Sequence, residues 1–179
     1  MVVRAVAGQE TAREEIARRA FRIALRTATA TLGSRPDAAD VAGDVTADVL
    51  AGLGRLREPA SFDAWVHRIT ARRTLRALRR RSEQSACDLP DDAWASAGLG
   101  TDEAIALREV MRRALEQLPP RQRLAMALRY VHDLKEAEVA AALGCRNGTA
   151  AALLSRARET LRLDPLLADF DPAPCGESR

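Results

Sequence analysis

Apolar residues recur every three or four positions along much of the chain, the spacing that places them on one face of an α-helix. In the first half this pattern predicts helices over about 10–32, 36–53 and 61–81. Pro36 suits the first turn of a helix because the N–H that it lacks would have no partner there. Ser61 can cap the third helix with its side-chain oxygen. The first half is therefore predicted to be a three-helix bundle.

The second half resumes the helical pattern after an interruption. Residues 82–103 lack apolar periodicity and contain Pro90, Gly98 and Gly100, which predicts a linker. Helices are expected over about 101–118, 120–131, 135–143 and 148–163, followed by a C-terminal tail over 164–179. The two patterns together predict an all-α protein of two small helical domains, 1–81 and 104–163, joined by an acidic linker.

The charges are strongly sorted along the chain. Residues 1–81 carry 16 arginines against 9 acids, whereas residues 82–103 carry 6 acids and no base. Residues 104–163 are basic again, with 11 bases against 6 acids. Basic modules of this kind attract a polyanion, usually nucleic acid, because each neutralised phosphate releases condensed counterions. The charge pattern therefore favours a nucleic-acid-binding protein.

Other classes of function find little support. The cysteines Cys87, Cys145 and Cys175 are far apart and have no histidine nearby, so neither a disulfide framework nor a metal site is expected. No carboxylate pair, activated nucleophile or phosphate-binding glycine loop stands in a catalytic arrangement, so we expect neither an enzyme nor a cofactor. The sequence shows no signal peptide and no apolar run of membrane-spanning length, which predicts a cytoplasmic protein without membrane insertion.

Two charged stripes are predicted in the first half. On the second helix, carboxylates step by three or four positions and share one face, apart from an apolar row at Val41, Val45 and Val49. On the third helix, four arginines line up over some 17 Å, a length that matches several phosphates of a strand. These arginines either bind nucleic acid or neutralise the carboxylates within the domain, and both can hold for different residues. The acids are Asp37, Asp40, Asp44 and Asp48, and the bases are Arg68, Arg72, Arg76 and Arg79 or Arg80.

The order of elements near the C-terminus is that of a helix-turn-helix. A helix over 135–143, a turn opening with Gly144 and a helix over about 148–163 would place the second helix in the DNA major groove. Helical hairpins with a glycine turn also occur in plain helix bundles. The pattern by itself therefore leaves DNA binding and simple packing both open.

The residues of both halves resemble one family. The stretch LEQLPPRQRLAMALRYVHDLKEAEVAAALGCRNGTAAALLSRARETLR, over 115–162, closely resembles region 4 of the extracytoplasmic-function sigma factors. The stretch SFDAWVHRITARRTLRALRRR, over 61–81, resembles the end of region 2 in the same family. The two matches occur in the family's order and at its separation. The resemblance implies core RNA polymerase, promoter DNA and an anti-sigma factor as partners.

The resemblance also implies site residues in region 2. A polymerase-binding motif of the second helix falls on Asp40, Val41, Asp44, Val45 and Asp48. Gly43 and Thr46 stand where the family usually has Gln and Phe, and a glycine inside a helix costs about 1 kcal/mol relative to alanine, so polymerase affinity is expected to be reduced. Contacts with the opened downstream promoter element fall on Arg57, Arg72, Arg73, Arg76 and Arg79.

The recognition helix departs most from the family. Ala151, Ala152 and Leu153 stand where Lys, Ser and Arg usually face the groove, and alanine cannot make the forked hydrogen bonds that read base edges. The remaining polar residues can reach phosphates and so position the helix without specifying much sequence. These candidate DNA contacts are Arg146, Asn147, Thr149, Ser155, Arg156 and Arg158.

Three interpretations follow from these features. The leading one is a sigma factor that directs core RNA polymerase to promoters, with relaxed upstream recognition. The second is a sigma-like regulator that acts through protein contacts, supported by Gly43, Thr46 and the alanine face of the recognition helix. A free-standing helix-turn-helix regulator is the third, and it leaves the region 2 resemblance unexplained.

Overall fold

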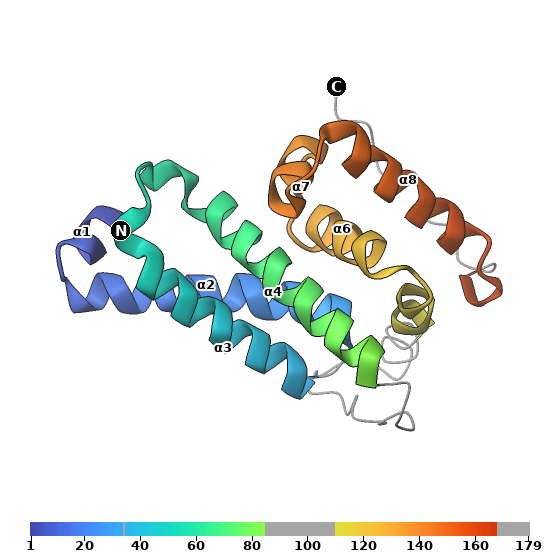
Figure 1. The fold of residues 1–179 in the computed structure, drawn as a ribbon, viewed down its shortest axis with the longest axis horizontal. Helices are drawn as coiled ribbons and strands as arrows, with labels where there is room; N and C mark the ends of the chain where they lie inside the picture. Colours follow the sequence, from blue (N-terminus) through green and yellow to red (C-terminus); the bar gives the residue numbers. More distant parts are fainter. Residues whose placement is uncertain (34, 85–109, 168–179) are drawn as a thin grey trace.

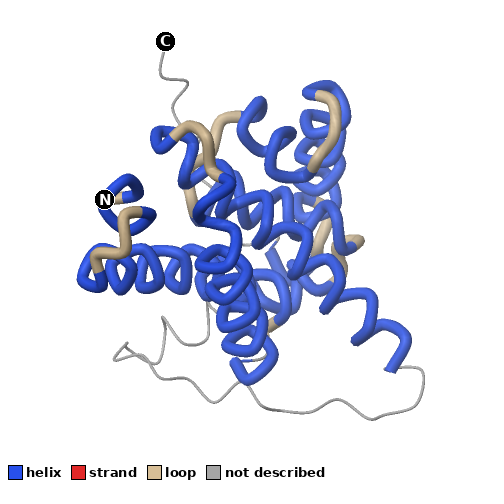
Figure 2. Tube along the Cα trace, turned by 60° about the vertical axis from the view of Figure 1, so that its left-hand side comes forward, coloured by secondary structure: helices blue, strands red, loops and turns tan. Residues whose placement is uncertain are grey.

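The computed structural model describes residues 1–33, 35–84 and 110–167. Within these ranges the chain consists of α-helices, short 3-10 helices and loops, with no strand (Figure 2). The all-α class predicted from the sequence is confirmed. No helix in the described ranges is both long enough and apolar enough to cross a membrane.

The first module consists of α1 (Val2–Val6), α2 (Glu10–Leu32), α3 (Arg35–Gly52) and α4 (Phe62–Gln84). Two 3-10 helices, η1 (Leu53–Arg55) and η2 (Pro59–Ser61), connect α3 to α4. Helix α2 has the predicted bounds and ends at Gly33, whose φ of 73° only glycine adopts readily. Helix α1 was not predicted, and α4 continues past Arg81, into the stretch expected to be linker.

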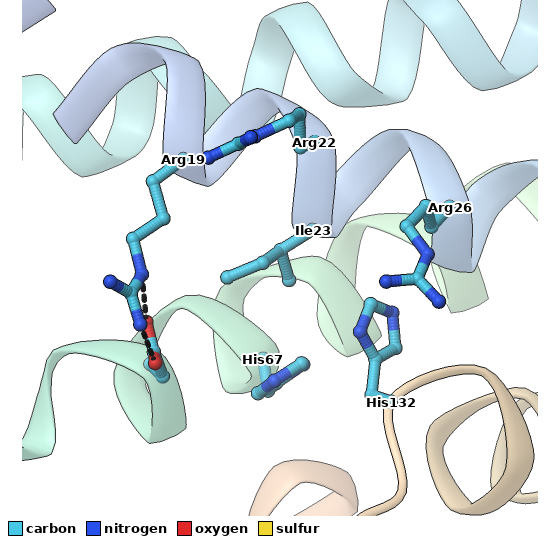
Figure 3. Close-up of a pocket in the computed structure, with 7 residues that line it drawn as sticks. Arg19, Arg22, Ile23, Arg26, His67 and His132 are labelled. Atoms are coloured by element: carbon cyan, nitrogen blue, oxygen red, sulfur yellow. Dashed lines mark hydrogen bonds and ion pairs between the residues drawn. The ribbon is translucent and has the colours of Figure 1, made fainter. Parts of the chain in front are cut away.

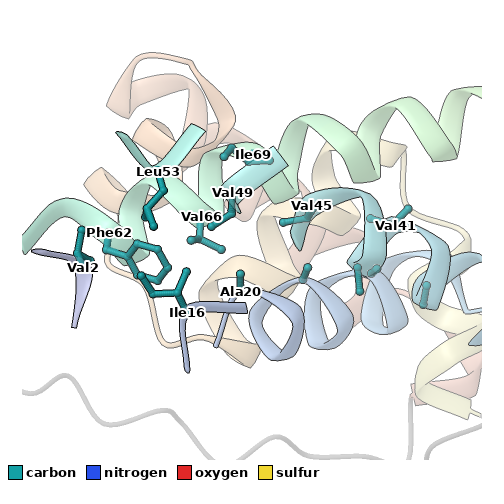
Figure 4. Packing of buried hydrophobic residues seen from close by; sticks show 14 of the residues in the cluster. Val2, Ile16, Ala20, Val41, Val45, Val49, Leu53, Phe62, Val66 and Ile69 are labelled. Carbon is teal, nitrogen blue, oxygen red and sulfur yellow. The ribbon is translucent and has the colours of Figure 1, made fainter. Parts of the chain in front are cut away.

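Small side chains form the core of this module. Helices α2, α3 and α4 pack against one another, and the face of α2 toward the other two carries buried alanines, among them Ala20, Ala24 and Ala28 (Figure 4). Val45 and Val49 of α3 are fully buried in the same cluster. Alanine allows close approach of helix axes, and the valines fill the remaining space. Burial of these apolar rows is what fixes the outward direction of the charged stripes.

The second module contains a helix that ends at 116, α6 (Pro120–Val131), α7 (Glu136–Leu143) and α8 (Asn147–Arg162), with η3 (Pro165–Leu167) after it. Its core is richer in leucine, with Leu124, Leu128 and Leu154 almost fully buried. Gly144 has a φ of 62° and forms the turn between α7 and α8. The predicted helix-turn-helix is thus present. Residues 168–179 of the expected tail lie outside the described residues. Residues 85–103 of the expected linker do so as well.

The two modules pack against each other (Figure 1). Helix α6 contacts α2 and α4, and α7 contacts α4. Ala71 of α4 is buried within the core of the second module, with Leu75 packed against the same cluster. One face of α4 therefore belongs to each module, and the arrangement leaves its remaining face for solvent.

Candidate nucleic-acid interface

The carboxylates of α3 differ in how far they are exposed. Asp40 and Asp44 are exposed, whereas Asp48 is half-buried. Val41 and Val45, which belong to the same expected polymerase motif, are 7% and 0% exposed because they pack in the core of the first module. A partner at this surface would therefore meet Asp40 and Asp44, while the two valines support the helix from within.

Arg73 joins α4 to α3 through a bidentate ion pair. Its Nε donates to Asp48 Oδ2 at 2.8 Å and its Nη2 donates to Asp48 Oδ1 at 2.7 Å, and Nη1 reaches Asp44 Oδ2 at 3.1 Å. The hydrogen bonds from Arg73 lower the pKa of Asp48 and raise that of Arg73. Such a forked contact holds the guanidinium in place, so Arg73 links α4 to α3 within the helix bundle in this structure.

The other expected arginines of α4 remain on the surface. Arg72, Arg76 and Arg79 are all exposed, and Arg72 lies 3.8 Å from Asp48 in a weak surface pair. Arg76 and Arg79 have no hydrogen-bond or ion-pair partner within the described part of the chain. The sequence left two interpretations open for the arginine stripe. In the structure the aspartates are neutralised mainly by Arg73, which is not a member of the stripe, whereas its members Arg72, Arg76 and Arg79 are exposed. Exposed arginines in a row can contact the phosphates of a strand.

Arg57 lies just outside this stripe, exposed in the loop between η1 and η2. The nearby Trp65 packs at the edge of the first core, with its ring 6.3 Å from that of Phe62. A Cβ at Gly52 would come within 2.9 Å of Trp65 Cζ2, so the end of α3 requires glycine for this contact. The connection that carries Arg57 is thus held by packing at both ends.

Helix α8 buries one face and exposes another. Ala150 and Leu154 are buried in a cluster with residues of α6 and α7, and Ala157 and Leu161 are buried in a second cluster with Ala114 and Leu118. Every expected DNA contact in and just before this helix is exposed. These residues are Arg146, Asn147, Thr149, Ser155, Arg156 and Arg158.

The three unusual positions of the recognition helix differ from one another. Leu153 is half-buried and packs against the core of the second module, and Ala151 is half-buried as well. Only Ala152 of the three is fully on the surface. The resemblance implies that all three face the groove, whereas in the structure Ala152 is the one of the three that is exposed.

A buried histidine, His67, and a half-buried one, His132, lie where the modules meet, and no sequence pattern predicted their pairing. His67 of α4 and His132, the residue that ends α6, form an edge-to-face pair with ring centroids 4.7 Å apart. Burial lowers the pKa of both, that of His132 to about 4, where His67 and Arg26 add to the effect. Thr27 Oγ1 lies 2.8 Å from His132 Nε2 and fixes the ring against α2.

Arginines complete this junction. Arg26 donates to the backbone oxygen of Val131 at 2.6 Å, and Arg123 donates to that of Thr31 at 3.1 Å. Arg81 donates to the backbone oxygen of Leu32 at 2.6 Å, so the C-terminal carbonyls of α2 are capped from both modules. In the described ranges, no group of three His, Cys, Asp or Glu residues is placed to hold a metal ion.

Comparison with known proteins gives the family. The sequence model of Sigma-70 region 2 matches residues 13–84 and that of Sigma-70, region 4 matches residues 108–161. The ECF RNA polymerase sigma factor SigM of Mycobacterium tuberculosis is 31% identical over 156 residues, which cover 87% of this chain and 78% of that protein. The chain belongs to the ECF sigma factors. Membership makes it a transcription-initiation protein and favours this reading over that of a sigma-like regulator.

Other relatives of this sigma factor agree. The ECF RNA polymerase sigma-E factor of Escherichia coli is 30% identical over 145 residues, which cover 73% of this chain and 76% of that protein. SigE of Mycolicibacterium smegmatis is 29% identical over 157 residues, and this chain spans 56% of its length.

Solved structures share the fold of this sigma factor. CnrH, in complex with the cytosolic domain of CnrY, matches with a TM-score of 0.67 over 96% of each chain at 21% identity. The sigma factor RpoE of Bartonella quintana, in complex with the anti-sigma factor NepR, matches with a TM-score of 0.68 over 85% of this chain and 94% of that one at 22% identity. The fold of this chain is therefore shared by both of these solved proteins.

Proposed function

We propose that this sigma factor directs core RNA polymerase to promoters and that its two modules divide the work. Region 2 would bind the polymerase through α3 and the opened promoter strand through α4. Region 4 would hold the upstream duplex through α8. The observation that carries this proposal is the contact of Arg73 with Asp44 and Asp48. It separates an acidic surface around Asp40 from the exposed arginines of α4, so both surfaces can be occupied together.

Region 4 would contribute position more than sequence preference. Arg146, Arg156 and Arg158 are exposed and can approach phosphates, whereas the exposed Ala152 offers a methyl group and no hydrogen bond to a base edge. The promoter would then be chosen mainly where region 2 opens the strands. This is the relaxed upstream recognition expected from the sequence.

Partners and place of action follow from the same proposal. RpoE is bound to the anti-sigma factor NepR in its structure, and an anti-sigma factor is the corresponding partner proposed for this chain. Core RNA polymerase works in the bacterial cytoplasm, so we place the protein there. The acidic linker would pass toward the nucleic-acid channel of the polymerase, where its charge competes with RNA. No catalytic step is assigned to this chain.

Capture of purified core RNA polymerase by the immobilised protein tests the proposal. The variant Asp40→Arg with Asp44→Arg should lose capture, since it reverses the charge of the exposed α3 surface. Glu14→Arg with Glu15→Arg on α2 is the matched control, because it changes the charge equally and also breaks one exposed ion pair, that of Glu14 with Arg18. Failure of the original chain to capture polymerase, with its helical fold verified, would contradict the proposal, as would equal loss in both variants.

A further inference from the structure

A pocket of about 360 Å³ lies where α2, α4 and the loop after α6 meet (Figure 3). Its walls come from both regions, with Arg19, Arg22 and Arg26 on α2, His67 on α4 and His132 after α6. None of the proposed contacts with polymerase or DNA uses these residues. The pocket therefore calls for an explanation of its own.

The pocket is positively charged. Arg19, Arg22 and Arg26 follow one another at spacings of three and four, which places them on one side of α2. Asp63 is the one acid among the described residues that line the pocket, and it accepts two hydrogen bonds from Arg19. The charges of Arg22 and Arg26 remain uncompensated there.

The donors of two arginines are largely unused. Within the described part of the chain, Arg22 has no hydrogen-bond or ion-pair partner. Arg26 uses one Nη2 hydrogen for the backbone oxygen of Val131, which leaves most of its five N–H donors. Both side chains border the pocket (Figure 3). A guanidinium that is held by one bond and faces an open pocket is well placed to bind an oxyanion.

The histidines add an unsatisfied polar group. His67 is only 5% exposed, yet its Nδ1 has no hydrogen-bond partner. Buried polar atoms in native proteins nearly always have a partner, so this nitrogen leaves an uncompensated polar group beside the pocket. The charged groups that act on the rings are Asp63 and Glu138 of α7 for His67, and Arg26 for His132.

His132 can respond to an anion. Thr27 Oγ1 donates its hydrogen to the backbone oxygen of Ile23 at 2.9 Å, so its contact with His132 uses an N–H of the ring at Nε2. The other ring nitrogen is then free to take up a proton. A dianion nearby would offset the repulsion from Arg26 and favour the protonated ring.

We propose that this pocket binds an oxyanion of the phosphate class and that the bound anion holds the two regions together. The anion would lie between Arg22, Arg26 and the histidine pair, and so contact side chains from both modules. Two net positive charges from the three arginines and Asp63 match a dianion. The pocket is larger than one phosphate group, which leaves room for a second, as in pyrophosphate or a nucleoside diphosphate.

Calorimetric titration of the full chain with inorganic phosphate and with pyrophosphate, at constant ionic strength, tests the site. We expect saturable binding of one anion per chain, and at least tenfold weaker binding by Arg22→Gln. Arg18→Gln is the control, since it removes the same charge from the same helix outside the pocket and breaks only the exposed pair with Glu14. Absence of saturable binding, or equal affinity in both variants, would overturn the proposal.

Two further arms test the source of the phosphate and the bridging. If Arg22→Gln weakens binding of a short DNA duplex while neither small anion binds, the site serves a nucleic-acid backbone and the proposal is wrong. Hydrogen exchange over residues 131–135 should slow with pyrophosphate in the original chain and not in Arg22→Gln. Unchanged exchange would refute the bridging. The proposed polymerase contacts include none of these pocket residues. Polymerase capture without added phosphate therefore tests the proposed function independently of anion binding.

Discussion

Helix α4 buries faces in both modules and α8 buries one face in its own, and the two helices expose surfaces of different kinds. The exposed side of α4 carries Arg72, Arg76 and Arg79, whereas that of α8 presents Ala152 among polar residues. Arginines in a row give binding energy to any phosphate backbone, and alanine gives neither charge nor hydrogen bonds to a base. The comparison teaches that one family architecture can concentrate DNA affinity in region 2 and leave region 4 mainly to position the duplex.

Removing the arginines of α4 should have the largest effect on DNA. With Arg72→Ala, Arg76→Ala and Arg79→Ala together, we expect the polymerase complex to bind promoter DNA roughly 100-fold more weakly, about fivefold for each lost phosphate contact. Equilibrium binding by fluorescence anisotropy measures this. A triple variant of equal charge outside the stripe, Arg4→Ala with Arg13→Ala and Arg18→Ala, should change affinity by less than threefold. Equal losses of promoter affinity in both triple variants would contradict the proposal that the arginines of α4 bind the DNA.

The junction between the two regions should weaken in acid. The pKa of His132 is lowered to about 4 in the folded chain, so the unfolded chain binds its proton first as the pH falls. The free energy of unfolding should therefore decrease between about pH 6.5 and pH 4, by on the order of 2 kcal/mol, and level off for this group below that range. Urea denaturation at several pH values measures the change.

The variant His132→Gln serves as the control for this pH dependence. Glutamine can still hydrogen-bond Thr27 but does not titrate, so the slope between pH 6.5 and pH 4 should become shallower. The lowered pKa of Asp48 acts at more acidic pH, since its unfolded value lies near 3.8. An unchanged slope in His132→Gln would show that the junction does not control this loss.

A third prediction concerns base recognition by α8, which a substitution at Ala152 should strengthen. Ala152 is exposed on the outer face of the helix, so Ala152→Arg can place a forked donor in the groove. We expect a preference for guanine at one upstream position of about 1 kcal/mol, which is roughly fivefold. Selection from a randomised upstream sequence measures it. Ala152→Gln should instead favour adenine, and selection without any base preference in either variant would place this position outside the groove.

The smallest expected effect concerns α3. Gly43 is exposed and a Cβ there meets no atom within 4 Å, so Gly43→Ala should stabilise the chain by about 0.5–1 kcal/mol. Thermal unfolding measures the gain as a rise of a few degrees in Tm. Gly52→Ala should lower Tm instead, because its Cβ would clash with Trp65. A stabilised Gly52→Ala would contradict the packing at the end of α3.

The helices were predictable because each has a long apolar row. The bounds of α2 and α6 agree with the expected ones, and Gly144 forms the expected turn. Helix α1 has five residues, too few for a periodic pattern. The reach of α4 past Arg81 was missed because its last residues, Ser82 to Gln84, carry no apolar residue to signal continuation.

The residues of the candidate site were predictable from the sequence. Which of them are exposed and which are engaged within the domain was less predictable. Charge spacing identified the aspartates of α3 and the arginines of α4, and the apolar row separated Val41 and Val45 from the charged face. Only the structure shows that Arg73 is held by Asp48. The histidine junction could not be found from spacing, because Thr27 and His132 lie 105 positions apart in the chain. Contacts of that kind depend on how the modules dock.

The most direct test of the account is transcription by core RNA polymerase with this protein on a pool of random promoter fragments. Sequencing the transcribed fragments compares the information in the downstream and upstream elements. The account predicts transcripts only when the protein is added, with a well-defined downstream element and a weak upstream one. Transcription no higher than with core polymerase alone would contradict the proposed function, and an upstream element as well defined as the downstream one would contradict the division of work between α4 and α8.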